Sequence, residues 1–195
     1  MIDAAPVFLT FDDGPDRDWT PRVLDLLAQA GVRATFFLLG EQALRQPALV
    51  RRIAAEGHAI GNHTFSHRHP WALTWHQAVA QVQGGCNAIE AVLGQRPQFY
   101  RAPHGRHRRC MTDAAVACGE TSVGWDLSAV DWGPLGTAPR IAARLRRVRA
   151  GDIVLMHDGR NRHNRPEELL RVLPGFLAEL ESRSLHPMVL PLGLS

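Results

Sequence analysis

Short apolar runs alternate with longer amphipathic stretches along this chain of 195 residues. The short runs are typical of buried strands and stand at 7–11, 34–39, 58–62, 98–101, 121–125, 152–156 and 188–192. The amphipathic stretches predict helices over 20–30, 47–56, 74–94, 137–150 and 164–182, and another that ends at 118. Because strands and helices alternate throughout, we expect a parallel sheet of about seven strands.

Three helix starts carry recognisable capping residues. Thr20 precedes Pro21, a residue favoured in the first helical turn. Thr74 and Gln77 have the spacing of a capping box. Asn164 precedes the last helical stretch, so we expect its side chain to cap that helix.

The chain predicts a distorted or incomplete (β/α) barrel. It is shorter than the roughly 250 residues typical of a closed barrel, and an open doubly wound sheet is the alternative. No linker or internal repeat divides it, so we expect one domain over residues 1–195. In a β/α barrel the loops after the strands build the active site, and most polar motifs of this chain follow a strand.

The composition is ordinary for a globular protein, with 45% hydrophobic and 21% charged residues. No run of 18 apolar residues predicts a membrane span. The N-terminus lacks the pattern of a signal peptide, so we expect a cytoplasmic protein, or one outside the cytoplasm if an export signal has been removed. Three cysteines without a CxxC motif are expected to be free thiols.

Two carboxylates stand at the end of the first predicted strand, at Asp12 and Asp13, and HTFSH supplies His63 and His67. One acid and two histidines can hold a divalent metal and leave a coordination position open for water. The second acid is then free to act as a base. The two histidines are four residues apart, so on one helical turn they would share a face. These residues predict a metal-dependent hydrolase.

Two other metal enzymes use related residues. The absence of the HExxH pattern, with Thr64 in place of the glutamate, argues against a zincin protease. Two histidines and one carboxylate could also hold Fe(II) in an oxygenase, but that interpretation gives Asp12 no role.

TFDDGP and HTFSH resemble the first two motifs of the polysaccharide deacetylases, carbohydrate esterase family 4, also called the NodB homology domain. The resemblance spans almost the whole chain and implies a NodB-like barrel. It implies that Asp12 is the catalytic base, and that Asp13, His63 and His67 bind the metal.

The segment from Arg101 to Gly105 resembles the third family motif, RxPxG. The resemblance implies that Arg101 holds the base in place, and that a backbone N–H after Pro103, that of His104, helps to form the oxyanion hole. Tyrosine is common in the family at the position of His104, so we expect this difference to alter the substrate groove.

Asp131 and Trp132 resemble the end of the fourth motif, and Leu155 to His157 resembles the fifth. The resemblance implies that His157 is the general acid, that Asp131 orients it, and that Trp132 and Leu155 line the pocket for the acetyl methyl group. The first aspartate of the fourth motif is replaced by Ser128, which we expect to change the loop rather than the chemistry.

The resemblance implies removal of N-acetyl groups from N-acetylglucosamine oligomers or polymers, such as chitin oligomers and peptidoglycan. Acetylated xylan and small or lipid-linked amino sugars are alternative substrates. The expected cofactor is one divalent metal, most simply Zn²⁺, although Co²⁺, Ni²⁺ or Fe²⁺ could occupy the same ligands. The sequence leaves the oligomeric state open.

Basic residues cluster after the third and fifth motifs, and the formal net charge is +3. We expect these clusters to form a rim that favours anionic sugars; the alternative is that they are solvated loop residues. No nucleic-acid motif is present, so nucleic acid is not an expected partner. A carbohydrate-binding relative without activity would have lost catalytic residues that this chain retains. The two clusters are Arg106, His107, Arg108 and Arg109, and Arg160, Arg162, His163 and Arg165.

Overall fold

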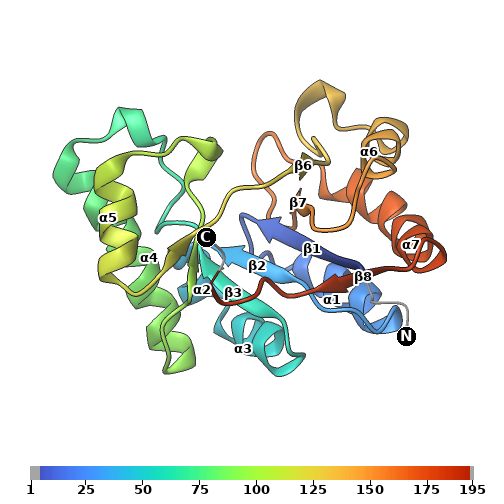
Figure 1. Ribbon diagram of the computed structural model, residues 1–195. Coiled ribbons are helices and arrows are strands. Elements are labelled where there is room, and N and C mark those ends of the chain that lie inside the picture. Colours follow the sequence, from blue (N-terminus) through green and yellow to red (C-terminus); the bar gives the residue numbers. More distant parts are fainter. Residues whose placement is uncertain (1–4, 194–195) are drawn as a thin grey trace.

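The computed structural model describes residues 5–193, so the outermost residues of the domain expected over 1–195 lie outside it. Strands and helices alternate along the described chain as the sequence predicts (Figure 1). The strands are β1 (Ala5–Asp12), β2 (Thr35–Leu38), β3 (Ala59–Asn62), β4 (Phe99–Tyr100), β5 (Thr121–Ser122), β6 (Leu127–Ser128), β7 (Ile153–His157) and β8 (Leu185–Met188). The helices are α1 (Thr20–Gln29), α2 (Gly40–Arg45), α3 (Pro47–Ala55), α4 (Trp75–Leu93), α5 (Arg109–Ala117), α6 (Ala138–Leu145) and α7 (Pro166–Ser182).

The strands form one sheet in which the paired neighbours run parallel. Seven strands follow one another in the order β5-β4-β3-β2-β1-β7-β6, and β8 pairs with the first half of β1. The order ends at β5 on one side and β6 on the other, so the sheet is a half-barrel. This confirms the expected incomplete barrel.

Two pairs of helices lie near opposite ends of the sheet. In Figure 1, α6 and α7 lie together near β7, whereas α4 and α5 lie together at the other end of the sheet. The main core contains β1 and β2, whose Phe11 and Phe36 rings stack with centroids 5.1 Å apart. A smaller core lies between α4 and α5 and includes Tyr100 and Met111. Burial of these apolar side chains is the main term that stabilises the sheet against its helices.

The parallel arrangement brings the ends of distant strands to one edge. β1 ends at Asp12, β3 ends at Asn62, directly before His63, and β7 ends at His157. Asp12 and His157 are register partners on neighbouring strands. Residues that are 145 positions apart in the sequence are therefore next to one another in the sheet.

Two predicted helix caps were wrong, and one was confirmed. Thr20 is the first residue of α1, and its hydroxyl donates a hydrogen bond to Asp158 instead of capping the helix. The side chain of Asn164 points to Asp13, and Arg165 precedes α7. The capping box of Thr74 and Gln77 is present at the start of α4.

The C-terminal strand also lies earlier than predicted, at Leu185–Met188 instead of 188–192. Strand β6 and helix α2 were not predicted. Both are short, so their sequences carry too little periodicity to separate them from loops. Among the described residues, no helix combines the length and the apolar character needed to cross a bilayer.

Candidate active site

Asp12 is the last residue of β1 and forms a buried ion pair with Arg101, which follows β4. Its Oδ1 atom lies 2.8 Å from Nη1 of Arg101. The guanidinium also donates to the Thr10 hydroxyl at 2.7 Å and to the Gly124 carbonyl at 2.8 Å. Because Arg101 is only 1% exposed, this pair is held in one orientation away from water. The second oxygen of Asp12, Oδ2, lies 3.7 Å from the His63 ring.

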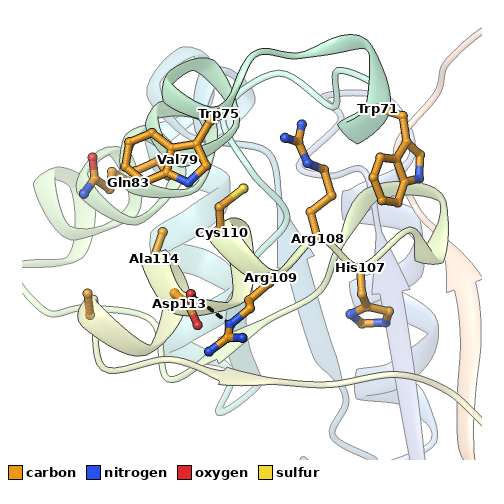
Figure 2. A pocket seen from close by; sticks show the side chains of 11 residues that line it. Trp71, Trp75, Val79, Gln83, His107, Arg108, Arg109, Cys110, Asp113 and Ala114 are labelled. Atoms are coloured by element: carbon orange, nitrogen blue, oxygen red, sulfur yellow. Dashed lines mark ion pairs between the residues drawn. The ribbon is translucent and has the colours of Figure 1, made fainter.

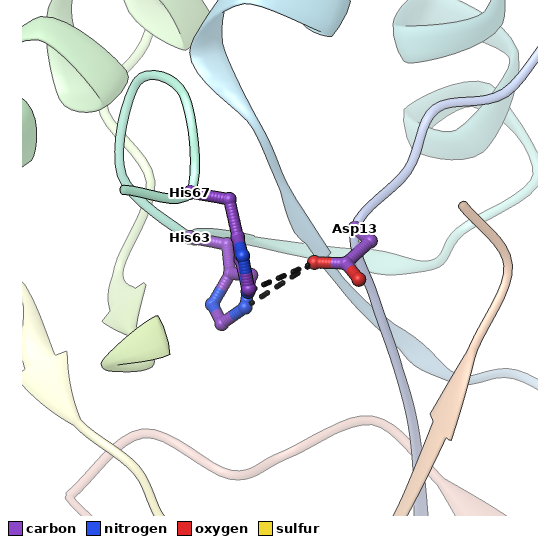
Figure 3. Close-up of side chains that lie close together, drawn as sticks. All are labelled: Asp13, His63 and His67. Atoms are coloured by element: carbon purple, nitrogen blue, oxygen red, sulfur yellow. Dashed lines mark ion pairs between the residues drawn. The ribbon is translucent and has the colours of Figure 1, made fainter. Parts of the chain in front are cut away.

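Asp13, His63 and His67 form a compact group that could hold a metal (Figure 3). Oδ1 of Asp13 lies 3.6 Å from Nε2 of His63 and 3.3 Å from Nε2 of His67. One ligand atom from each of the three residues lies within 4.8 Å of the others. Two imidazoles and one carboxylate are suitable ligands for a divalent transition metal.

Neighbouring groups leave the ligand atoms of this group free for a metal. Nδ1 of His63 lies 2.8 Å from the Arg101 carbonyl, which can only accept, so Nδ1 carries the proton and Nε2 keeps its lone pair. Oδ2 of Asp13 accepts from Asn161 at 2.8 Å and from Asn164 at 2.7 Å. Oδ1 is buried and has no hydrogen-bond partner. A metal would provide that partner, so the residues present fit one.

The protonation states also suit metal ligands. Burial, together with the charge of His67, lowers the pKa of His63 to about 3, so its ring is neutral at pH 7. Burial acts to raise the pKa of Asp13, but the charges of His67, His157 and His63 outweigh it and lower that pKa. An ionised carboxylate and a neutral imidazole can bind a metal without first losing a proton.

The two histidine ligands are held by a loop, which corrects the expected shared helical face. Residues 63–69 lie outside the helices, and both Thr64 and His67 have positive φ angles, of 72° and 54°. The Thr64 N–H donates to the Asn62 side chain at 2.9 Å, which fixes the first turn of the loop. Asp13 is also left-handed, with φ 73°. Non-glycine residues rarely adopt this conformation, and it is concentrated at functional sites.

His157 lies beside Asp12, at the end of the neighbouring strand, and is held by Asp131. Nδ1 of His157 lies 2.8 Å from Oδ1 of Asp131, and the backbone N–H of His157 donates to Oδ2 at 2.8 Å. Burial acts to lower the pKa of His157, but the charge of Asp131 and its hydrogen bond raise it to about 9. Nε2 of this ring therefore carries a proton at neutral pH.

These residues line a cavity of about 280 Å³. Of the residues implied to bind substrate, His104, Gly105, Trp132 and Leu155 line it. Pro103 is buried behind the wall and does not line it. The Trp132 ring lies edge-on to His157, with centroids 5.3 Å apart.

The two departures from the family motifs have local explanations. His104 has φ 58°, and its ring lies 4.5 Å from the His67 ring and 5.0 Å from the His69 ring. Ser128 accepts a hydrogen bond from the Val130 N–H at 3.1 Å and so supports a left-handed turn just before Asp131. Ser128 therefore holds the loop that carries Asp131.

The sequence did not reveal three further residues of the cavity: Trp125, Asn161 and Asn164. Asn161 and Asn164 contact Asp13 across about 150 positions of sequence. Only their position shortly after the fifth motif, in the loop before α7, could have drawn attention to them.

Comparison with known sequences identifies the family of this chain. The model of the polysaccharide deacetylase family matches residues 3–123. This chain belongs to that family. It is 38% identical over 154 residues to a chitooligosaccharide deacetylase of Bradyrhizobium, covering 78% of this chain and 70% of the relative. It is 42% identical over 128 residues to a peptidoglycan-N-acetylglucosamine deacetylase of Bacillus cereus, covering 66% of this chain and 46% of that relative.

Solved structures agree with the family assignment. A family 4 carbohydrate esterase from Streptomyces lividans, in complex with acetate, has a TM-score of 0.86 and 30% identity, covering 96% of this chain and 93% of the esterase. A peptidoglycan N-acetylglucosamine deacetylase in complex with 4-naphthalen-1-yl-N-oxidanyl-benzamide has a TM-score of 0.88 and 34% identity, covering 97% and 87% of the two chains. The half-barrel is thus the fold of this family, and the family together with the group of Asp13, His63 and His67 indicates a divalent metal.

Proposed function

We propose that this protein removes N-acetyl groups from N-acetylglucosamine units of oligo- or polysaccharides, with Zn²⁺ held by Asp13, His63 and His67. One observation carries the proposal: Asp12 and His157 line one cavity together with the group that could hold the metal, and each is paired with a buried partner behind the wall, Arg101 and Asp131 respectively. The similarity to a chitooligosaccharide deacetylase and to a peptidoglycan-N-acetylglucosamine deacetylase supports this substrate class.

Asp12 is the proposed base. When bound, the metal would polarise the acetyl carbonyl and make the attacking water more acidic. Asp12 accepts a proton from that water, because its carboxylate faces the metal group and is held in that orientation by Arg101. Arg101 is buried and does not line the cavity, so it positions the base without contacting the sugar.

His157 is the proposed acid. An amine is a poor leaving group unless it is protonated, and His157 carries a proton at neutral pH because of Asp131. Asp131 fixes the proton of the ring on Nδ1, so the opposite nitrogen faces the cavity. The amide nitrogen receives this proton as the carbon–nitrogen bond breaks, and acetate and a free amine are the products.

The cavity walls complete the proposed site. The His104 backbone N–H donates to the developing oxyanion, a contribution of a few kcal/mol in comparable enzymes. Trp132 and Leu155 pack against the acetyl methyl group. Gly105 has φ 63°, and a Cβ at that position would lie 2.6 Å from the Trp125 ring, so glycine is required for this wall.

Acetate release tests the proposal. The zinc-loaded protein is incubated with N-acetylglucosamine oligomers, peptidoglycan fragments and acetylated xylan, beside the Asp12→Ala variant. We expect release from the N-acetylated sugars that Asp12→Ala abolishes. Release from xylan alone would make the protein an O-acetyl esterase, and no release from a protein that holds metal would favour a binding role.

A further inference from the structure

A second pocket lies between the first half of α4 and helix α5, outside the cavity described above (Figure 2). We call it the tryptophan pocket; it has a volume of about 610 Å³. Trp71 and Trp75 stand at its two ends, with Arg108 between them. Trp71 is 64% exposed and Trp75 is 57% exposed. Large aromatic side chains that gather in a hollow at the surface commonly mark a binding site.

Trp71 and Arg108 hold each other in place. Nη1 of Arg108 donates to the carbonyl of Pro70 at 2.7 Å and to that of Leu73 at 2.9 Å. Its guanidinium lies 5.6 Å from the centre of the Trp71 ring. The guanidinium of Arg108 therefore already has partners within the protein. These contacts hold Trp71 in one orientation although it is exposed.

Besides Arg108, the charged side chains that line the pocket are Arg109 and Asp113. Arg109 is highly exposed, and its Nε lies 3.8 Å from Asp113. His107 lies beside it and is also exposed. An ion pair this exposed is weak, so Arg109 can bind an external carboxylate at little cost. The pocket thus combines flat apolar surfaces with an available guanidinium.

One continuous segment of the chain borders both the tryptophan pocket and the catalytic cavity. Within the continuous segment 104–110, His104 and Gly105 line the catalytic cavity, whereas His107 and Cys110 line the tryptophan pocket. A second connection passes through His69, whose ring lies 5.0 Å from the His104 ring and whose Nδ1 accepts from the Trp71 N–H. Helices α4 and α5 follow β3 and β4, which end beside the catalytic cavity, so the starts of both helices, with Trp75 and Arg109, lie near that edge of the sheet.

We propose that the tryptophan pocket binds the continuing chain of a carboxylate-bearing N-acetylhexosamine polymer while one of its sugars occupies the catalytic cavity. This inference rests on the proposed function. Pyranose rings present faces of C–H groups that pack against indole rings, and they would do so on Trp71 and Trp75. Arg109 would bind a carboxylate of the chain through charged hydrogen bonds. A sugar chain can pass from one pocket to the other along the segment 104–110, which borders both.

Binding measured without turnover tests this inference. Asp12→Ala is used as the parent, and calorimetry gives its affinity for the dimer and hexamer of N-acetylglucosamine and for a peptidoglycan glycan hexamer that carries carboxylates. We expect Trp71→Ala and Trp75→Ala each to weaken binding of the hexamers by about three- to tenfold and to leave the dimer unchanged. Arg109→Gln should weaken binding of only the carboxylate-bearing hexamer. Leu44→Ala, an exposed apolar residue outside the pocket, is the control.

Equal affinity of the tryptophan variants and their parent for the hexamers would overturn the proposal. So would self-association of the protein that Trp71→Ala abolishes without changing sugar binding, because the pocket would then hold a second copy of the chain. The two proposals can fail independently. If the wild-type protein releases no acetate but hexamer binding still needs both tryptophans, sugar binding by the tryptophan pocket is supported and the proposed deacetylase activity is contradicted.

Discussion

At the scale of single residues, the site depends on buried charges that each have a defined partner. Asp12 faces Arg101, His157 faces Asp131, and Asp13 is held by two amides. A buried charge without a partner is strongly destabilising. Within each pair, therefore, one side chain fixes the position of the other. The positions of the acid and the base are thus fixed before a substrate arrives.

The amides behind Asp13 should control metal affinity. Asn164→Ala removes one donor to Oδ2 of Asp13, so the carboxylate is less well oriented for a metal. We expect zinc affinity to fall by about 10- to 100-fold, as measured by competition with a chelator. Asn87→Ala, an exposed residue of α4, is the matched control. Unchanged zinc affinity in Asn164→Ala would show that the amide does not orient the ligand.

Asp131 should set the pH at which His157 loses its proton. The pKa of His157 is about 9 because the charge of Asp131 and its hydrogen bond outweigh the opposing effect of burial. Asp131→Asn removes that charge, so the pKa should fall and the alkaline limb of kcat should move to lower pH. We expect kcat at neutral pH to fall by about 10²- to 10⁴-fold. NMR titration of the ring checks the pKa, and an unchanged value would remove Asp131 from its proposed role.

At the scale of elements, close contacts between helices and loops hold the metal loop in place. Helix α4 packs on α2 and against the loop that carries His63 and His67. Gly85, within α4, allows this approach: a Cβ there would lie 2.1 Å from Oδ1 of Asn62 and 2.8 Å from the Thr64 backbone. Asn62 supports Thr64, so the position of α4 is coupled to the shape of the metal loop.

The same substitution in two helices should therefore have opposite effects. Gly85→Ala forces α4 away from Asn62 and Thr64, so we expect a loss of unfolding free energy of about 1–3 kcal/mol, together with weaker zinc binding. Gly175→Ala in α7 meets nothing within 4 Å and should stabilise the protein by up to about 1 kcal/mol. Urea denaturation measures both. A stable Gly85→Ala protein with normal zinc binding would contradict the close contact.

At the scale of the whole molecule, the sequence predicted the strands that carry the chemistry but not all contacts between them. Asp13 and His63 directly follow strands and His157 ends one, and a parallel sheet brings such positions to one edge. The contact of Asn164 with Asp13 could not be predicted, because it depends on how the loop before α7 folds back over β1. The loop that carries His67 could not be predicted either, because the histidine spacing also suits a helix.

A buried carboxyl group away from the cavity links stability to pH. Burial raises the pKa of Glu120 to about 8, although hydrogen bonds from Asn62 oppose this. Between about pH 5 and 8 the folded state therefore holds a proton that the unfolded state has lost, so unfolding free energy falls as pH rises through this window.

Glu120→Gln keeps the shape of the side chain and removes its ionisation. We expect the unfolding free energy of the variant, measured in urea, to depend less on pH between pH 5 and 8 than that of the wild type. Glu181→Gln, at an exposed position of α7, should leave the wild-type dependence unchanged. The same slope in wild type and Glu120→Gln would show that Glu120 is not the group responsible.

The central claim is that Asp13, His63 and His67 hold one metal ion that deacetylation requires. Titration of the metal-free protein with zinc, with bound metal and acetate release followed in the same samples, tests it most directly. We predict that acetate release from an N-acetylglucosamine oligomer rises with bound zinc and saturates at one ion per chain, and that His63→Ala neither binds zinc nor releases acetate. Acetate release at the full rate before zinc is added would contradict the claim.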